Sequence, residues 1–162
     1  MYEHILACTD GSELAGQGLD HAFRLAKELS SKVTIVTVTE PAPLTGTDAV
    51  GGWIPMHVDR QQYASGLKQH AEKILSDAKN AAVTIGVAAE TVYVPDAWPA
   101  VAIVATAESR HCDLIVMASH GRRGLGRMLL GSQTSDVLVT STIPVLVIRA
   151  SKSGDAGRSG GE

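Results

Sequence analysis

Two polar segments of this chain hold the residue types that bind anions. The first is Thr9-Asp10-Gly11-Ser12, and the second runs from Ser119 to Ser132. Glycine lets the backbone approach a ligand and expose its N–H groups, and a helix that starts at Gly131-Ser132 would point its first amides at an anion. The alternative for these glycines is a flexible crossover connection. Hydroxyl and guanidinium groups near the glycines of the second segment favour a phosphate site instead. They belong to Ser132, Thr134, Arg122, Arg123 and Arg127.

Two common phosphate motifs are absent from the sequence. A P-loop ends in Gly-Lys-Ser/Thr, and no such tripeptide occurs here. A dinucleotide fingerprint reads G-x-G-x-x-G after the first strand, whereas Gly124 and Gly126 lie in the second segment and are followed by Leu129. The sequence therefore supports neither a P-loop NTPase nor a dinucleotide-dependent dehydrogenase.

Other reactive side chains each have a plain structural alternative. Asp10 either contacts a ligand or is a turn residue that caps the first helix, because turns favour aspartate. His120 has no apparent carboxylate partner to orient it, so we expect a loop residue rather than a catalyst. Cys8 and Cys112 form no close-spaced metal or redox motif and are expected to be small buried residues. Trp53 and Trp98 are either walls of a pocket or packed residues, and packing is the expected role of both.

Strand and helix patterns alternate along the chain and must position these segments. Short apolar or β-branched runs predict five strands: His4–Ala7, Val33–Val38, Thr91–Val94, Leu114–Ala118 and Val145–Ile148. Helical spacing, with Ser12 as an N-cap and Pro99 at a first helical position, predicts four helices: 13–29, 63–78, 99–107 and 133–140. This alternation predicts one α/β domain with a parallel sheet and right-handed crossovers.

The order of the strands decides whether the two polar segments meet. In open α/β sheets a ligand lies at the carboxyl ends of the strands, where the strand order reverses. For a five-stranded sheet with helices on both faces and the order 3-2-1-4-5, strands 1 and 4 meet at that point. The polar segments follow those two strands, so we expect them to form one pocket.

Composition narrows the class of protein. The 162 residues suit one domain, and 14 basic against 17 acidic residues give a formal charge of −3, which argues against a general nucleic-acid binder. The chain lacks a signal-peptide start and any apolar run near the roughly 18 residues of a membrane span, so we expect a cytoplasmic protein. Residues 1–150 are expected to form the domain and residues 151–162 a disordered tail.

The stretch from Glu40 to Val58 interrupts the alternation. It contains three prolines and three glycines: Pro41, Pro43, Pro55, Gly46, Gly51 and Gly52. Long irregular loops are uncommon in compact domains and often have a function. We expect a surface loop or a lid here.

Four stretches resemble the universal stress protein family, with a likeness over about residues 2 to 149. They are DLIVMASHGRRG from Asp113 to Gly124, Leu130-Gly131-Ser132, Ile143–Ile148 and the opening Ile5–Ser12. The resemblance implies a stress-response or regulatory protein that binds an adenine nucleotide, ATP or AMP, with Mg²⁺ if it is ATP. It also implies a homodimer formed through the last strand, 145–148.

The ATP-binding branch of that family has the motif G-x2-G-x9-G-[ST]. Its positions fall here on Ala118, Gly121, Gly131 and Ser132, so alanine replaces the first glycine. The added methyl group costs little where φ is negative and much where φ is positive. An alternative is therefore a dimeric interaction module of the same family without nucleotide. A slow ATP hydrolase is a further alternative, although no general base stands out.

The resemblance also assigns roles to individual residues. Thr9 and Asp10 would lie near the base and ribose, and Val38 would offer its backbone to the adenine edge. Met117 and Ala118 would line the nucleoside. The remaining members of the implied nucleotide site hold or flank the phosphates: His120, Gly121, Arg123, Gly131, Ser132, Gln133 and Thr134.

Overall fold

The computed structural model describes residues 1–41, 45–47, 53–55, 59–119 and 130–149. A five-stranded sheet lies at its centre, and its neighbouring strands are parallel. The strand order is β5-β2-β1-β6-β7. Counting only these five strands along the chain, the order is 3-2-1-4-5, which confirms the predicted topology. The strands are β1 His4–Cys8, β2 Lys32–Val38, β5 Ala89–Val94, β6 Leu114–Ala118 and β7 Val145–Ile148.

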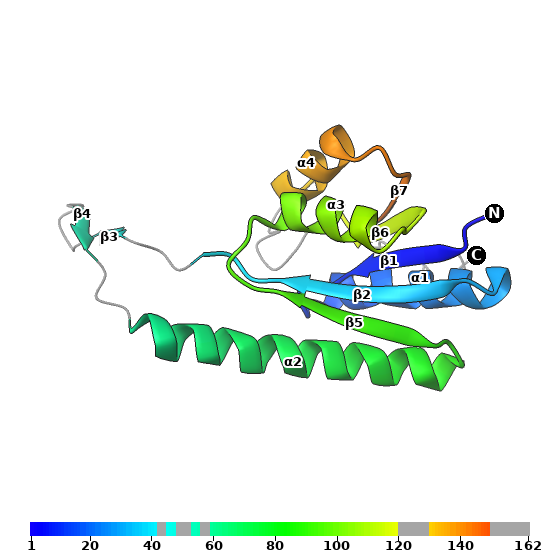
Figure 1. Ribbon diagram of the computed structural model, residues 1–162, viewed down its shortest axis with the longest axis horizontal. Helices are drawn as coiled ribbons and strands as arrows, with labels where there is room; N and C mark the ends of the chain where they lie inside the picture. The colour runs from blue at the N-terminus through cyan, green and yellow to red at the C-terminus, as the bar shows by residue number, and fades with distance from the viewer. Residues whose placement is uncertain (42–44, 48–52, 56–58, 120–129, 150–162) are drawn as a thin grey trace, which may run out of the picture.

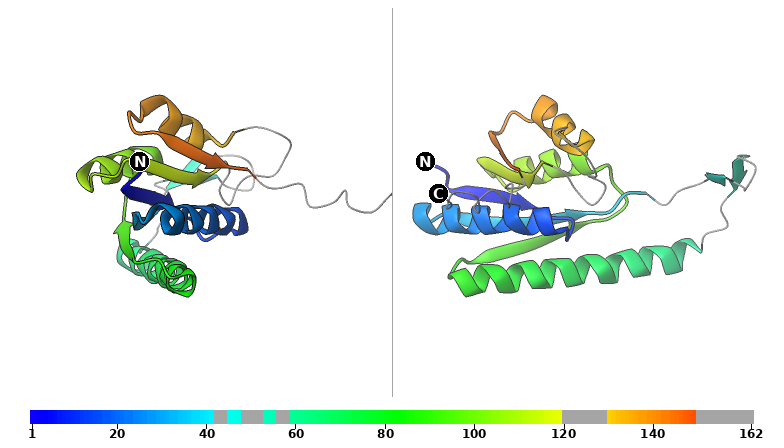
Figure 2. Two further views of the ribbon diagram at one scale, coloured as in Figure 1. Left: turned by 90° about the vertical axis from the view of Figure 1, so that its right-hand side faces the viewer. Right: turned by 180° about the vertical axis from the view of Figure 1, so that it is seen from behind.

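Helices cover both faces of this sheet, as the sequence predicted. Helices α1 (Glu13–Leu29) and α2 (Arg60–Ile85) lie on one face, and α3 (Pro99–Ser109) and α4 (Ser132–Thr140) lie on the other (Figures 1 and 2). Within the described part of the chain, no helix combines the length and hydrophobicity that crossing a membrane requires.

Local signals explain where the helices begin and end. The Ser12 hydroxyl accepts a hydrogen bond from the Ala15 N–H at 3.2 Å, which confirms Ser12 as the N-cap of α1. Asp59 caps α2 in the same way, and Pro99 occupies the start of α3. Helix α2 ends at Gly86, whose φ of 84° is the left-handed conformation that glycine adopts without strain.

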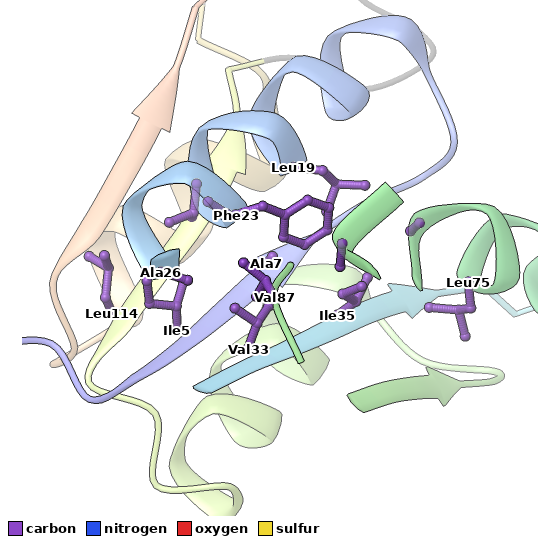
Figure 3. Close-up of a cluster of buried hydrophobic side chains, with 14 residues drawn as sticks. Ile5, Ala7, Leu19, Phe23, Ala26, Val33, Ile35, Leu75, Val87 and Leu114 are labelled. Atoms are coloured by element: carbon purple, nitrogen blue, oxygen red, sulfur yellow. The ribbon is translucent and has the colours of Figure 1, made fainter. Parts of the chain in front are cut away.

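Two separate apolar layers hold the sheet between the helix pairs. Successive residues of a strand point to opposite faces, so Ile5 and Ala7 join the layer under α1 and α2, while Leu6 and Cys8 join the layer under α3 and α4. Phe23 of α1 lies at the centre of the first layer (Figure 3). Burial on both faces explains why the central strands are continuous apolar runs.

The prediction for residues 40–58 was wrong in part. Within this stretch Thr45–Thr47 (β3) pairs with Trp53–Pro55 (β4) as an antiparallel two-stranded sheet. Paired backbone groups satisfy each other there, which an irregular loop would not provide. The sequence signal is weak because each strand has only three residues and one of them, Gly46 or Pro55, is of a type that strands disfavour. The expected lid and the expected tail at 151–162 otherwise fall outside the described residues.

Candidate functional site

The carboxyl ends of β1 and β6 are neighbours in the sheet. Ala7 of β1 pairs with Val116 of β6, so the segments that begin at Thr9 and Ser119 leave the sheet side by side. Helices α1 and α4 start directly after these segments. The structure thus places the first segment and the two described ends of the second at one edge, at the point where the strand order reverses.

The first segment is a tight turn held by its own side chains. The Thr9 N–H donates to the Val36 carbonyl at 3.0 Å, and the Thr9 hydroxyl accepts from the Gly11 N–H at 3.1 Å. Asp10 Oδ1 accepts from the Ser12 N–H at 2.9 Å, and Gly11 has a φ of 77°, which favours glycine. The turn role weighed for Asp10 is therefore present in the structure, and ligand contact is the second role to test.

The second segment has its two described ends joined by hydrogen bonds. The Gly131 N–H donates to the Ser119 carbonyl at 2.8 Å, and the buried Thr134 hydroxyl donates to the Ala118 carbonyl at 3.1 Å. The start of α4 is therefore fixed against the end of β6. Three of the predicted site residues lie between these ends, outside the described residues: His120, Gly121 and Arg123.

The first turn of α4 presents backbone donors at this edge. The Ser135 N–H donates to the Gly131 carbonyl at 2.9 Å and forms the first bond of the helix. The amides of Ser132, Gln133 and Thr134 precede it and have no hydrogen bond within the described part of the chain. Such groups at a helix start attract anions.

Gln133 has a contact that the sequence did not reveal. Its side-chain Oε1 accepts from the Ala100 N–H at 3.1 Å and so caps the start of α3. This bond joins α3 to α4 across 33 positions of the sequence. A phosphate at the start of α4 would therefore contact the backbone N–H of Gln133, because the side-chain carbonyl of Gln133 already accepts a hydrogen bond from α3.

Val38 lies where β2 extends past the end of β1. The Thr39 N–H donates to Val94 and the Thr39 carbonyl accepts from Ala97, so Thr39 faces β5. Backbone groups alternate between the two sides of a strand, and the N–H and C=O of Val38 therefore point toward β1. The last residue of β1, Cys8, pairs with Val36, so the strand ends before it reaches Val38. The N–H and C=O of Val38 therefore face the candidate site.

The backbone at Ala118 suits alanine. Among described residues other than glycine, positive φ occurs only at Ser30, Asp96 and His111. Ala118 is the last residue of β6 and is 8% exposed. Because φ at Ala118 is not positive, alanine in place of the motif glycine causes no backbone strain here. Met117, beside it, is buried in the layer under α3 and α4.

The two cysteines are buried, as predicted. Burial raises the pKa of Cys8 to about 12, with a smaller contribution from Cys112. The pKa of Cys112 rises to about 11, first through burial and then through the charge of Asp113. Among the described residues, no group of three His, Cys, Asp or Glu side chains is placed to bind a metal ion.

These pKa values predict that both thiols are inert in the folded protein. Because the thiolate is the reactive form, a disulfide-exchange reagent at neutral pH should label neither cysteine until denaturant is added. Both cysteines ionise at lower pH in the unfolded chain, near 9.0, so stability should fall as pH rises from there toward 12. Colorimetric thiol titration with and without urea measures the labelling, and rapid labelling of the native protein would contradict the prediction.

The prediction that Trp98 packs was wrong. It precedes α3, is 66% exposed and lines a hollow between α3 and α4, as the pocket-wall alternative has it. The side chain of Trp53 lies outside the described side chains.

Known proteins are similar to this chain in sequence and in fold. The model of the universal stress protein family matches residues 1–149. Universal stress protein YxiE of Bacillus subtilis is 36% identical over 151 residues, which cover 92% of this chain and 100% of YxiE. The structure of MJ0577, a protein of Methanocaldococcus jannaschii, superimposes with a TM-score of 0.78 at 28% identity and covers 94% of this chain and 99% of that one. A universal stress protein in complex with cAMP has a TM-score of 0.63 at 26% identity and covers 91% and 96%.

Proposed function

Because the chain belongs to the universal stress protein family, we propose that it is a stress-response or regulatory protein that binds an adenine nucleotide, ATP or AMP. The nucleotide lies between the segments that follow β1 and β6. The cAMP complex of a related protein supports an adenine ligand. The proposal rests on three features that meet at one end of the sheet: the N–H and C=O of Val38, which have no strand partner among the described residues, the turn at Asp10, and the first amides of α4.

Each part of this edge suits one part of the nucleotide. Adenine presents a ring nitrogen acceptor beside an amino donor, and the N–H and C=O of Val38 offer the complementary pair. Asp10, at the end of β1, accepts hydrogen bonds from ribose hydroxyls, with Thr9 beside it. Met117 and Ala118 line the nucleoside.

The phosphates belong at the start of α4. The amides of Ser132, Gln133 and Thr134 donate to them, and the helix dipole favours their negative charge. The Ser132 hydroxyl is exposed and adds a donor, while the Thr134 hydroxyl holds β6. Gly131 gives the backbone room to approach. His120, Gly121 and Arg123 complete the proposed set, and Mg²⁺ accompanies ATP.

Calorimetric titration tests this proposal. Saturable binding of Mg-ATP or AMP is expected. GTP should bind clearly more weakly, because guanine reverses the donor and the acceptor that would pair with the backbone of Val38. Titrating ATP without metal separates the contribution of Mg²⁺. No heat and no thermal shift at millimolar adenine nucleotide would refute the proposal, and equal binding of GTP would refute the role of Val38.

Ala118→Gly separates the proposal from its alternative, an interaction module without nucleotide. Since φ at Ala118 is not positive, the variant should change nucleotide affinity by less than about tenfold, or 1.4 kcal/mol. It should lower the free energy of unfolding by about 0.5–1 kcal/mol, the cost of glycine inside a strand. Calorimetry and urea denaturation measure the two effects. A variant that binds ATP when the wild type does not would show that the methyl group blocks the site.

We also propose that two copies pair through β7, as the sequence resemblance implies. Strand β7 is the last strand of the sheet, so one side of its backbone has no neighbour among the described strands, and Leu146 on it is 39% exposed. Sedimentation of the Leu146→Lys variant tests this: it should form a smaller assembly than the wild type, because a charge on an edge strand opposes pairing. An assembly of unchanged size would contradict it.

A further inference from the structure

Helix α2 is longer than the sheet that it covers. Its residues 60–70, called here the α2 arm, are exposed except for the half-buried Leu67. Figure 1 shows these turns running on past the ends of β2 and β5. From Ala71 onward the helix packs on the sheet through one stripe: Ala71, Leu75, Ala78 and Ala82.

The apolar stripe does not stop where the sheet stops. Tyr63 and Leu67 precede Ala71 at intervals of four, so they lie on the same face of the helix. Tyr63 is 37% exposed. Arg60 and Lys68 flank these two residues, and the arm contains no acidic residue, although the exposed Lys68 Nζ lies 3.8 Å from Glu72 Oε1 just beyond the arm. The α2 arm is therefore an apolar ridge with basic neighbours, and the described part of this chain does not cover it.

A hollow of complementary character lies on the opposite face of the sheet. It occupies about 570 Å³ between α3 and α4 and is called here the α3–α4 groove. Its lining is mainly apolar, with Trp98, Val101 and Val139, which is 85% exposed. Its only charged lining residues among those described are acidic, Glu108 and Asp136. The groove thus offers apolar contact and two carboxylates.

We propose that the α3–α4 groove of one copy receives the α2 arm of a second copy. Tyr63 and Leu67 enter between the valines, and Arg60 and Lys68 meet Glu108 and Asp136. Apolar ridges of helices pack into such grooves, and opposite charges at the rim set the register.

Other occupants fit less well. The arm and the groove of one chain lie on opposite faces of its own sheet (Figure 2), so a chain cannot fill its own groove. Residues 150–162 contain no apolar residue larger than alanine and cannot fill an apolar hollow. Two grooves packed against each other would place carboxylates opposite carboxylates. The arm of a second copy has both the apolar ridge and the opposite charge.

The contact is separate from pairing through β7. Helix α2 lies beside β5, at the other edge of the sheet from β7. The contact joins different surfaces of two copies, the arm of one and the groove of the other, and it closes into a pair when each copy inserts its arm into the groove of its partner. The inference does not depend on nucleotide, and its test needs none.

Charge reversal tests the contact in a Leu146→Lys background, which removes pairing through β7. Arg60→Glu with Lys68→Glu reverses the arm, and Glu108→Arg with Asp136→Arg reverses the groove. All four side chains are exposed, so folding should be retained, as circular dichroism would verify. Each reversal alone should weaken self-association by at least about tenfold in sedimentation equilibrium, because like charges then face each other. The two reversed proteins mixed, or both reversals in one chain, should restore association.

Cross-linking tests which residues meet. One copy carries Tyr63→Cys and the other Val139→Cys, while the native cysteines are buried. Under mild oxidation the mixture should give a covalent pair. A control mixture in which Val83→Cys, exposed on the far part of α2, replaces Tyr63→Cys should give none. Any of three results would overturn the inference. The Leu146→Lys protein is monomeric, neither reversal affects its association, or it binds a basic amphipathic peptide without associating with itself.

Discussion

Replacing Phe23 by alanine is expected to lower the free energy of unfolding by about 3–5 kcal/mol, the usual cost of deleting a buried phenyl ring. Phe23 is the only phenylalanine of the chain and is 1% exposed. Its ring lies between α1 and the strands, near Leu19 and Val87 (Figure 3). The loss combines the transfer of the ring to water with the cavity that rigid strands leave behind. Domains of this kind are stable by only about 5–15 kcal/mol, so the effect is large.

Urea denaturation followed by circular dichroism measures this loss. Phe23→Leu is the matched control, because it keeps most of the apolar volume and should cost well under half as much. Val83→Ala, on an exposed part of α2, should stay within about 0.5 kcal/mol of the wild type. A loss below about 1 kcal/mol for Phe23→Ala would mean that the layer under α1 is not packed as described.

Replacing Asp10 by alanine is expected to weaken adenine nucleotide binding by about 10- to 150-fold, since a hydrogen bond to a charged group contributes about 1.5–3 kcal/mol. Two causes act together. The carboxylate no longer accepts from ribose, and the turn loses the bond between Asp10 and the Ser12 N–H. Calorimetric titration with the better-binding nucleotide measures the change.

Two variants separate the ligand role of Asp10 from its turn role. Asp10→Asn keeps an oxygen that accepts from Ser12, so it should preserve stability while losing most of the affinity. Ser12→Ala removes the cap of α1 and should cost about 0.5–2 kcal/mol of stability with little direct effect on the ligand. If Asp10→Asn binds nucleotide as the wild type does, the proposed ligand role of this residue is refuted.

Much of the fold follows from signals that act over a few residues. The five parallel strands, the Ser12 cap and the Pro99 helix start were each predicted from local residue types. The two polar segments were predicted to meet because strands 1 and 4 are neighbours in the order 3-2-1-4-5. Boundaries moved where local signals are weak: α2 extends from Arg60 to Ile85 rather than over 63–78, and β5 starts at Ala89 rather than Thr91.

The sequence by itself determined the order of the elements, the edge at which a ligand would lie and the residue types available there. Tertiary structure alone decided that φ at Ala118 tolerates a methyl group, that Gln133 caps α3, and that the stripe of α2 is covered only from Ala71 onward. The physical reason is range. Helix caps, turns and strand patterns depend on neighbours along the chain, whereas these three features depend on which distant surfaces pack together and where that packing ends.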